Sequence, residues 1–199
     1  MDKLDSPESI FHSCGGQLRM GEAIHRGMTR HTLYALRDRG VIEQLGRGVY
    51  RLAAMPPTTR PDLLTVALRI PKAVICLISA LDFHGLTTQI PHVIDIGLPR
   101  TAGIPRLDHP PLTVRRFSDT TYTAGIEKHM IDEATIKIYS PEKTLADCFK
   151  FRNKIGMDVV LEALRLYRDR KNPRIGDILK YAKICRVEKV IMPYLEASI

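Results

Sequence analysis

The chain has 199 residues, of which 44% are hydrophobic and 26% are charged, as is ordinary for a globular protein with a buried core. Its formal net charge of +8 suits a polyanionic partner, without choosing between DNA, RNA and a membrane surface. No segment has the length and apolarity of a membrane span, and residues 1–11 lack the order of an export signal. We therefore expect a cytoplasmic protein with no membrane partner.

Residues 19–40 carry the clearest pattern, which is two short helices around a glycine turn. Apolar residues one helical turn apart predict a helix that ends at Gly27, where glycine adopts a positive φ without steric strain. Thr29 is a typical N-cap for the next helix, which Gly40 ends. With a further helix predicted over residues 6–14, this order indicates a helix-turn-helix.

Two alternating segments, residues 41–45 and 49–52, follow the second of these helices and flank a glycine-rich turn with Arg47 at its centre. This is the pattern of a β-hairpin. A basic-tipped hairpin after a helix-turn-helix is typical of a winged helix, whose usual ligand is duplex DNA. We predict a winged helix-turn-helix DNA-binding domain over residues 1–54. A connector rich in proline and threonine follows over residues 55–61.

The second helix of this domain offers the candidate contacts with DNA, because its leucines face the core and its polar residues face outward. The candidates, with the hairpin tip, are Thr29, Arg30, His31, Tyr34, Arg37, Arg39 and Arg47. We expect the first four at the major groove, Arg37 or Arg39 on phosphate, and Arg47 in the minor groove. The alternatives are a solvated helix whose arginines keep the domain soluble, and an ordinary polar turn at the hairpin. Tyr50 is expected in the core.

Residues 62–199 predict a mixed α/β domain with a helical C-terminal tail, so the whole chain is expected to be α+β. A helix over residues 62–70 precedes a strand-like entry and a short helix that ends at Gly85. The last helix is expected to bend at Pro193. Strands are predicted over residues 92–98, 112–117, 125–131 and 134–139, and helices over residues 140–152, 157–168, 175–184 and 187–198.

Residues that an enzyme would use are scattered over this second domain. A metal-dependent nuclease needs clustered carboxylates, whereas Glu142 and Asp147 share one helix face poorly and Asp95 stands alone on a predicted strand. His84 precedes a glycine, as helix-end histidines often do. No nucleotide-binding, hydrolase or zinc-protease motif occurs, and the 4 cysteines and 7 histidines lack zinc-ligand spacing. We expect no enzyme activity, no metal and no cofactor, with a nuclease-like domain as the alternative.

A second group of basic residues lies near the C-terminal ends of two successive predicted helices. It comprises Lys150, Arg152, Lys154, Arg165, Arg168 and Arg170. Basic residues near helix C-termini often only complement the helix dipole. The equally open alternative is a second patch for nucleic acid or protein, with Tyr167 and Tyr181 as stacking groups.

Residues 136–167, IKIYSPEKTLADCFKFRNKIGMDVVLEALRLY, resemble the AbiEi family, the antitoxin-and-repressor half of type IV toxin–antitoxin systems of phage defence. SALDFHGLTTQIP at residues 79–91, PYLEA at 193–197 and RGVYRL at 47–52 match it too. The resemblance implies that the winged helix binds inverted repeats in the promoter of its own operon and represses it. It also implies that the C-terminal domain counteracts a nucleotidyltransferase-like toxin without a stable complex, and it supplies no catalytic residues.

The main hypothesis is therefore a repressor and antitoxin that forms a weak homo-oligomer on its promoter. Two other interpretations stay open. The chain could be a stand-alone DNA-binding regulator without a toxin. The winged helix could instead pair with another protein, although its charge argues against this because such faces are more often apolar.

Overall fold

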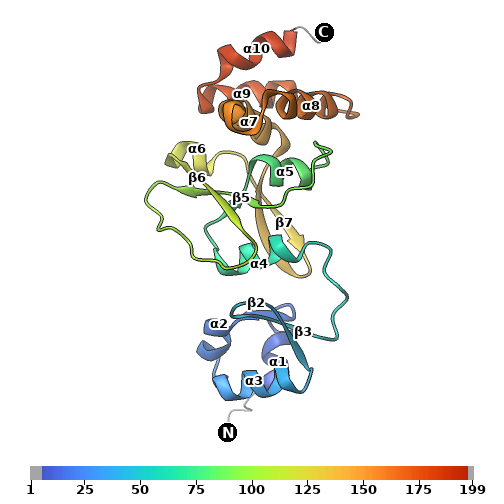
Figure 1. Cartoon of the computed structure of the whole chain (residues 1–199), viewed down its shortest axis with the longest axis vertical. Helices are drawn as coiled ribbons and strands as arrows, with labels where there is room; N and C mark the ends of the chain where they lie inside the picture. The colour runs from blue at the N-terminus through green and yellow to red at the C-terminus, as the bar shows by residue number, and fades with distance from the viewer. Residues whose placement is uncertain (1–5, 197–199) are drawn as a thin grey trace. The chain divides into compact units, whose positions relative to one another are not determined.

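The computed structural model describes residues 6–196 and combines helices with strands, which confirms the predicted α+β class (Figure 1). The chain divides into two compact units. The first unit extends to Lys72 and also includes residues 105–110 and 129–136. Helix α4 (Pro61–Arg69), which the sequence analysis gave to the second domain, therefore lies in the first unit. The functional boundaries of the domains stay a prediction.

The first unit contains the predicted winged helix. Its helices are α1 (Pro7–His12), α2 (Met20–His25) and α3 (Arg30–Asp38), and its strands are β1 (Gln17–Arg19), β2 (Ile42–Gly46) and β3 (Val49–Leu52). The strands form an antiparallel sheet in the order β1-β3-β2. Strand β1 was not predicted, because three residues are too few to show an alternating pattern. It pairs with β3 through Leu18 and Tyr50.

Local chemistry explains where α3 begins and which way it faces. The Thr29 hydroxyl accepts a hydrogen bond from the Thr32 amide at 3.0 Å, so Thr29 is the predicted N-cap. Gly27 precedes it with a φ of +92°. Leu33 and Leu36 are buried together with the ring of Tyr50, as predicted, and this leaves the opposite face of α3 exposed.

A five-stranded mixed sheet in the order β6-β5-β4-β8-β7 and the C-terminal helices follow α4. The strands are β4 (Val74–Ile75), β5 (Ile94–Pro99), β6 (Leu112–Phe117), β7 (Ile126–Ile131) and β8 (Ala134–Tyr139). The helices are α5 (Leu77–Phe83), α6 (Asp119–Thr123), α7 (Pro141–Ile155), α8 (Met157–Arg168), α9 (Ile175–Cys185) and α10 (Glu188–Glu196). Strand β5 pairs antiparallel with β4 and parallel with β6.

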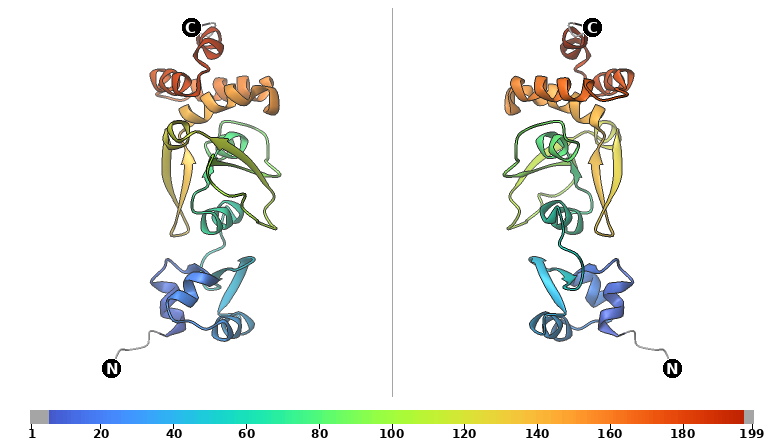
Figure 2. Two further views of the ribbon diagram at one scale, coloured as in Figure 1. Left: turned by 90° about the vertical axis from the view of Figure 1, so that its left-hand side faces the viewer. Right: turned by 90° about the vertical axis from the view of Figure 1, so that its right-hand side faces the viewer.

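The strands and helices predicted for this part of the chain are confirmed. Helix α6 was not predicted, because five residues are too few to repeat the helical period. Helices α7 to α10 gather at one end of the sheet (Figure 2). Pro193 lies inside α10, and residues 197 and 198, which were predicted to extend this helix, lie outside the described residues. Within residues 6–196, no helix has the length and apolarity needed to cross a bilayer.

The first half of α7 buries an ion pair in the core. The Lys143 ammonium donates to an Asp147 carboxylate oxygen at 2.5 Å, and both side chains are 0% exposed. The ammonium also lies 4.2 Å from the centroid of the Tyr139 ring, and the Cys185 thiol donates to the second Asp147 oxygen at 3.3 Å. The attraction between the two charges therefore offsets the free-energy cost of removing each of them from water.

Glu142, one residue before Lys143, is buried in a separate network. It accepts hydrogen bonds from the Tyr167 hydroxyl at 2.7 Å and from the Arg174 guanidinium at 2.8 Å. Burial raises the pKa of Glu142, but these hydrogen bonds outweigh it and hold the pKa below its ordinary value. Tyr167 is thus a core residue that fastens α8 to α7.

We expect Asp147→Ala to lower the free energy of unfolding by about 3–5 kcal/mol, because the Lys143 ammonium would stay buried without a counter-charge. Denaturant titration followed by circular dichroism measures this change. The exposed Asn153 on the same helix provides the control, since Asn153→Ala should change the free energy by less than about 0.5 kcal/mol. Equal midpoints for the two variants would contradict the prediction.

Candidate nucleic-acid interface

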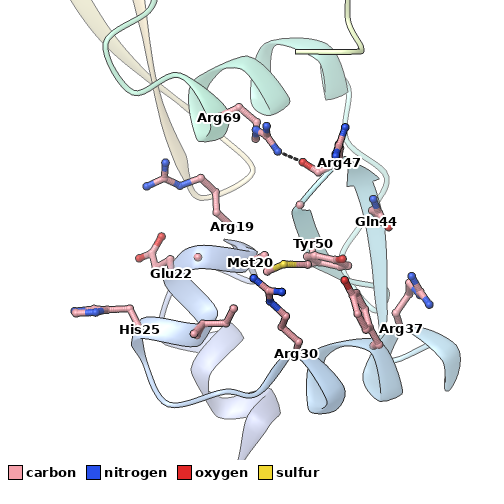
Figure 3. A pocket seen from close by; sticks show the side chains of 14 residues that line it. Arg19, Met20, Glu22, His25, Arg30, Arg37, Gln44, Arg47, Tyr50 and Arg69 are labelled. Atoms are coloured by element: carbon pink, nitrogen blue, oxygen red, sulfur yellow. Dashed lines mark hydrogen bonds between the residues drawn. The ribbon is translucent and has the colours of Figure 1, made fainter. Parts of the chain in front are cut away.

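An open groove of about 1210 Å³ lies in the first unit, between α2, α3 and the β2–β3 hairpin, with α4 contributing one side chain (Figure 3). Arginines dominate its charged lining. They are Arg19, Arg30, Arg37, Arg47 and Arg69. Among the described residues, Glu22 is the one carboxylate that lines the groove, and it pairs with Arg26 at 3.3 Å. The groove is therefore strongly cationic.

Four of the seven predicted DNA contacts line this groove, namely Arg30, Tyr34, Arg37 and Arg47. Arg30 is exposed and makes no ion pair with any described residue, and in Figure 3 it extends from α3 toward Met20. Arg47 is also accessible, with 82% of its side chain exposed, although it lies 3.3 Å from a carboxylate oxygen of Asp108. An exposed pair of this kind is weak and competes poorly with phosphate.

Arg37 and Tyr34 form a stacked pair on the exposed face of α3. The Arg37 guanidinium lies 5.0 Å from the centroid of the Tyr34 ring. It also donates to an Asp38 oxygen at 2.7 Å, and this hydrogen bond raises the pKa of Arg37. The contacts with Tyr34 and Asp38 therefore favour one orientation of the guanidinium.

The other three predicted contacts lie outside the groove lining. The Thr29 hydroxyl is occupied in capping α3, and Thr29 lines a separate hollow beside Arg26. His31 and Arg39 are exposed on the remaining faces of α3, where Arg39 is the C-cap. Contact of these three residues with DNA stays a prediction.

Sequence reasoning missed five polar residues of the groove, one of which is the acidic Glu22 on α2. Arg19 ends the unpredicted strand β1, His25 ends α2, and Gln44 lies opposite Tyr50 on the neighbouring strand. Arg69 comes from α4 and had no local signal at all. Tyr50 itself is 2% exposed, which confirms that it is a core residue, and burial raises its pKa.

The basic residues of α7 and α8 are only partly available as a second patch. Lys150, Lys154 and Arg165 are exposed, whereas Arg152 donates to the Phe149 carbonyl at 2.9 Å. Arg170 donates to the backbone carbonyl of His84, and a terminal nitrogen of Arg168 is buried without a hydrogen-bond partner among the described residues. The idea that Tyr167 stacks on a ligand is wrong, because that ring is 2% exposed. Nucleic-acid binding by this group stays a prediction.

The residues considered for catalysis have partners within the protein. His84 bonds the Tyr139 carbonyl at 2.8 Å, while Glu142 and Asp147 serve the two buried networks of α7. Asp95 is buried on β5, 4.0 Å from Arg115. Across residues 6–196, no group of three or more His, Cys, Asp and Glu side chains is placed to hold a metal ion.

Residues 9–53 match the model of a family described as transcriptional regulator, AbiEi antitoxin. Residues 9–53 of the first unit are therefore similar to this family. The match covers the winged helix and confirms, for these residues, the resemblance drawn from the sequence. The matched segment ends before α4 begins, so Arg69 lies outside it.

Among solved structures, the crystal structure of RV2827C protein from Mycobacterium tuberculosis is similar to the chain at 14% identity. The similarity covers 95% of this chain and 80% of that chain, with a TM-score of 0.49. This score and identity carry no argument about function. A comparison with curated proteins finds no match.

Asp95 gives the second unit a distinctive dependence on pH. Burial raises its pKa to about 6, although Arg115 and a backbone amide oppose the shift. Because the folded state holds this proton more tightly than the unfolded state, the carboxyl lowers stability as pH rises from about 4 to about 6. We expect Asp95→Asn to remove this penalty. Its stability relative to the unsubstituted chain should rise by up to about 3 kcal/mol between pH 4 and pH 7.5.

Denaturant titrations of both proteins at several pH values measure this difference. Asp82→Asn, on the neighbouring α5, is the control for a change of charge at a less buried carboxylate. A constant difference between Asp95→Asn and the unsubstituted chain over the whole pH range would contradict the assignment.

Proposed function

We propose that the chain is a DNA-binding transcriptional autorepressor and the antitoxin of a type IV toxin–antitoxin system. The observation that carries the DNA-binding part is the cationic groove on the AbiEi winged helix, with Arg30 and Arg47 exposed at its two sides. Duplex DNA presents closely spaced phosphates at the edges of grooves that admit a helix. The exposed face of α3 and the arginine of the hairpin match that arrangement of charge.

In the proposed complex, α3 enters the major groove and the hairpin lies over the adjacent minor groove. Arg30 and Tyr34 reach base edges or the adjoining backbone, since both project from the exposed face of α3. Arg37 contacts a DNA phosphate, because its stacking on Tyr34 and its hydrogen bond to Asp38 orient the guanidinium. Arg47 follows the minor groove.

The proposed operator is an inverted repeat in the promoter of the operon that encodes the chain. An inverted repeat presents two equivalent half-sites, so two copies of the winged helix bind with two-fold symmetry. We propose that the copies associate weakly and only on the DNA.

The antitoxin part of the proposal assigns the task to the second unit. Its support is the resemblance of residues 136–167 to AbiEi proteins and the description of the family that matches the winged helix. The proposed toxin is a nucleotidyltransferase-like protein, whose activity the chain counteracts without forming a stable complex. A stand-alone regulator is the alternative.

The DNA-binding proposal predicts that Arg30→Ala, Arg37→Ala and Arg47→Ala together weaken binding to the promoter duplex by at least about tenfold near 0.15 M salt. Three phosphate or base contacts are removed, and the slope of log affinity against log salt should fall by about one for each lost phosphate contact. Fluorescence anisotropy at several salt concentrations measures both quantities.

The matched control removes three positive charges from the exposed Lys171, Lys180 and Lys189 by substitution with alanine. Circular dichroism checks that both triple variants fold. The control should keep its affinity within about threefold, because long-range screened charge contributes little. Equal losses in the two triple variants would show that net charge, rather than the groove, determines binding.

The two proposed activities should separate. The groove variant should fail to repress a promoter–reporter fusion, yet still protect cells that express a nucleotidyltransferase-like protein encoded beside it. A reporter assay and a growth assay on the same strains measure these outcomes. Loss of protection together with repression would place antitoxin activity on the winged helix, and no protection even by the unsubstituted chain would favour the stand-alone regulator.

A further inference from the structure

The turn that carries Arg47 rests directly against α4. A Cβ atom added at Gly46 would lie 3.2 Å from the Thr65 methyl group, and one added at Gly48 would lie 3.2 Å from a terminal nitrogen of Arg69. Thr65 and Arg69 are four residues apart, so they share one face of the helix. This face of α4 therefore contacts the glycines on both sides of Arg47.

A hydrogen bond makes this contact specific. The Arg69 guanidinium donates to the backbone carbonyl of Arg47, as Figure 3 shows. From the other side, the Met20 amide at the start of α2 donates to the Gly48 carbonyl at 2.9 Å. The backbone of the turn is thus held by two elements, while the Arg47 side chain stays exposed.

Helix α4 is itself well anchored, so it can fix the turn. It packs against β1, β2 and β3. Leu63, Leu64 and Val66 are buried, and Thr65 is only 3% exposed. A mobile helix would restrict the conformation of the hairpin very little, whereas a helix anchored by these buried residues keeps one position.

We propose that Arg69 is a positioning residue that fixes the hairpin turn, so that Arg47 meets DNA in one preset place. The inference rests on the proposed DNA-binding function and extends the DNA-binding module to α4, beyond the segment of the AbiEi match. Its physical basis is preorganisation, because a turn ordered before binding loses less conformational entropy in the complex. The competing role for Arg69, which also lines the groove, is an independent phosphate contact.

A double-mutant cycle on the full chain separates the two roles. Binding of the promoter duplex is measured by fluorescence anisotropy for Arg47→Ala, Arg69→Ala and the double variant. If Arg69 acts through Arg47, each single variant loses about fivefold to tenfold, and the double variant stays within about twofold of Arg47→Ala. Losses that multiply in the double variant would overturn the proposal.

Arg69→Lys adds a test that keeps the charge but not the planar guanidinium. A positioning role predicts a loss close to that of Arg69→Ala, whereas a lysine that retains the full affinity would support a plain phosphate contact. Hydroxyl-radical footprints give a third readout. Arg69→Ala should lose protection at the hairpin and keep it along α3, and uniform loss of protection would mean general destabilisation and overturn the positioning role.

Thermal unfolding shows whether each variant is folded before it is compared. If Arg69→Ala does not fold, Thr65→Ala takes its place in the cycle, because it loosens the contact with Gly46 and leaves the charge of the groove intact. The outcomes also distinguish the two proposals. Failure of the unsubstituted chain to bind the promoter duplex rejects the proposed function, whereas binding with multiplicative losses rejects only the role of Arg69.

Discussion

The packing of α3 against the small sheet is the constraint on which the candidate interface depends. Leu33 and Leu36 can reach the ring of Tyr50 only if one face of the helix turns inward, and a helix of nine residues then has a single way to present the rest. Arg30 and Tyr34 face outward for that reason alone. The surface that we assign to DNA is thus a by-product of the hydrophobic core, and a defect in the core would misdirect the arginines without touching them.

The polar sequence at the start of α7 shows the opposite use of charged residues. Ser140, Glu142, Lys143 and Asp147 are all buried, and each has a partner within the protein. A cluster of acids, a lysine and a nearby cysteine can suggest chemistry in a linear sequence. Here the same groups join α7 to α8 and α9 through hydrogen bonds in the core.

The sequence predicted most of the secondary structure because its signals are local. Caps such as Ser6 and Thr29, and glycines with positive φ, mark helix ends within a few residues. Strand β1 and helix α6 were missed because each is too short to repeat its period. The groove was only half predicted, since Arg19 and Arg69 are brought to it by tertiary packing. Likewise, nothing local distinguishes a stacking tyrosine from Tyr167, whose hydroxyl is satisfied by a glutamate on another helix.

The braced turn has a consequence for how DNA recognition can diversify. A Cβ atom at Gly46 or Gly48 would lie 3.2 Å from a side-chain atom of α4, and Gly48 also has a φ of +71°, which favours glycine. The side chain of Arg47 between them is 82% exposed. Exchange of that one residue would alter what the hairpin recognises and preserve its shape. Under the proposed function, single substitutions at residue 47 would therefore change the operator that is recognised while the turn keeps its shape.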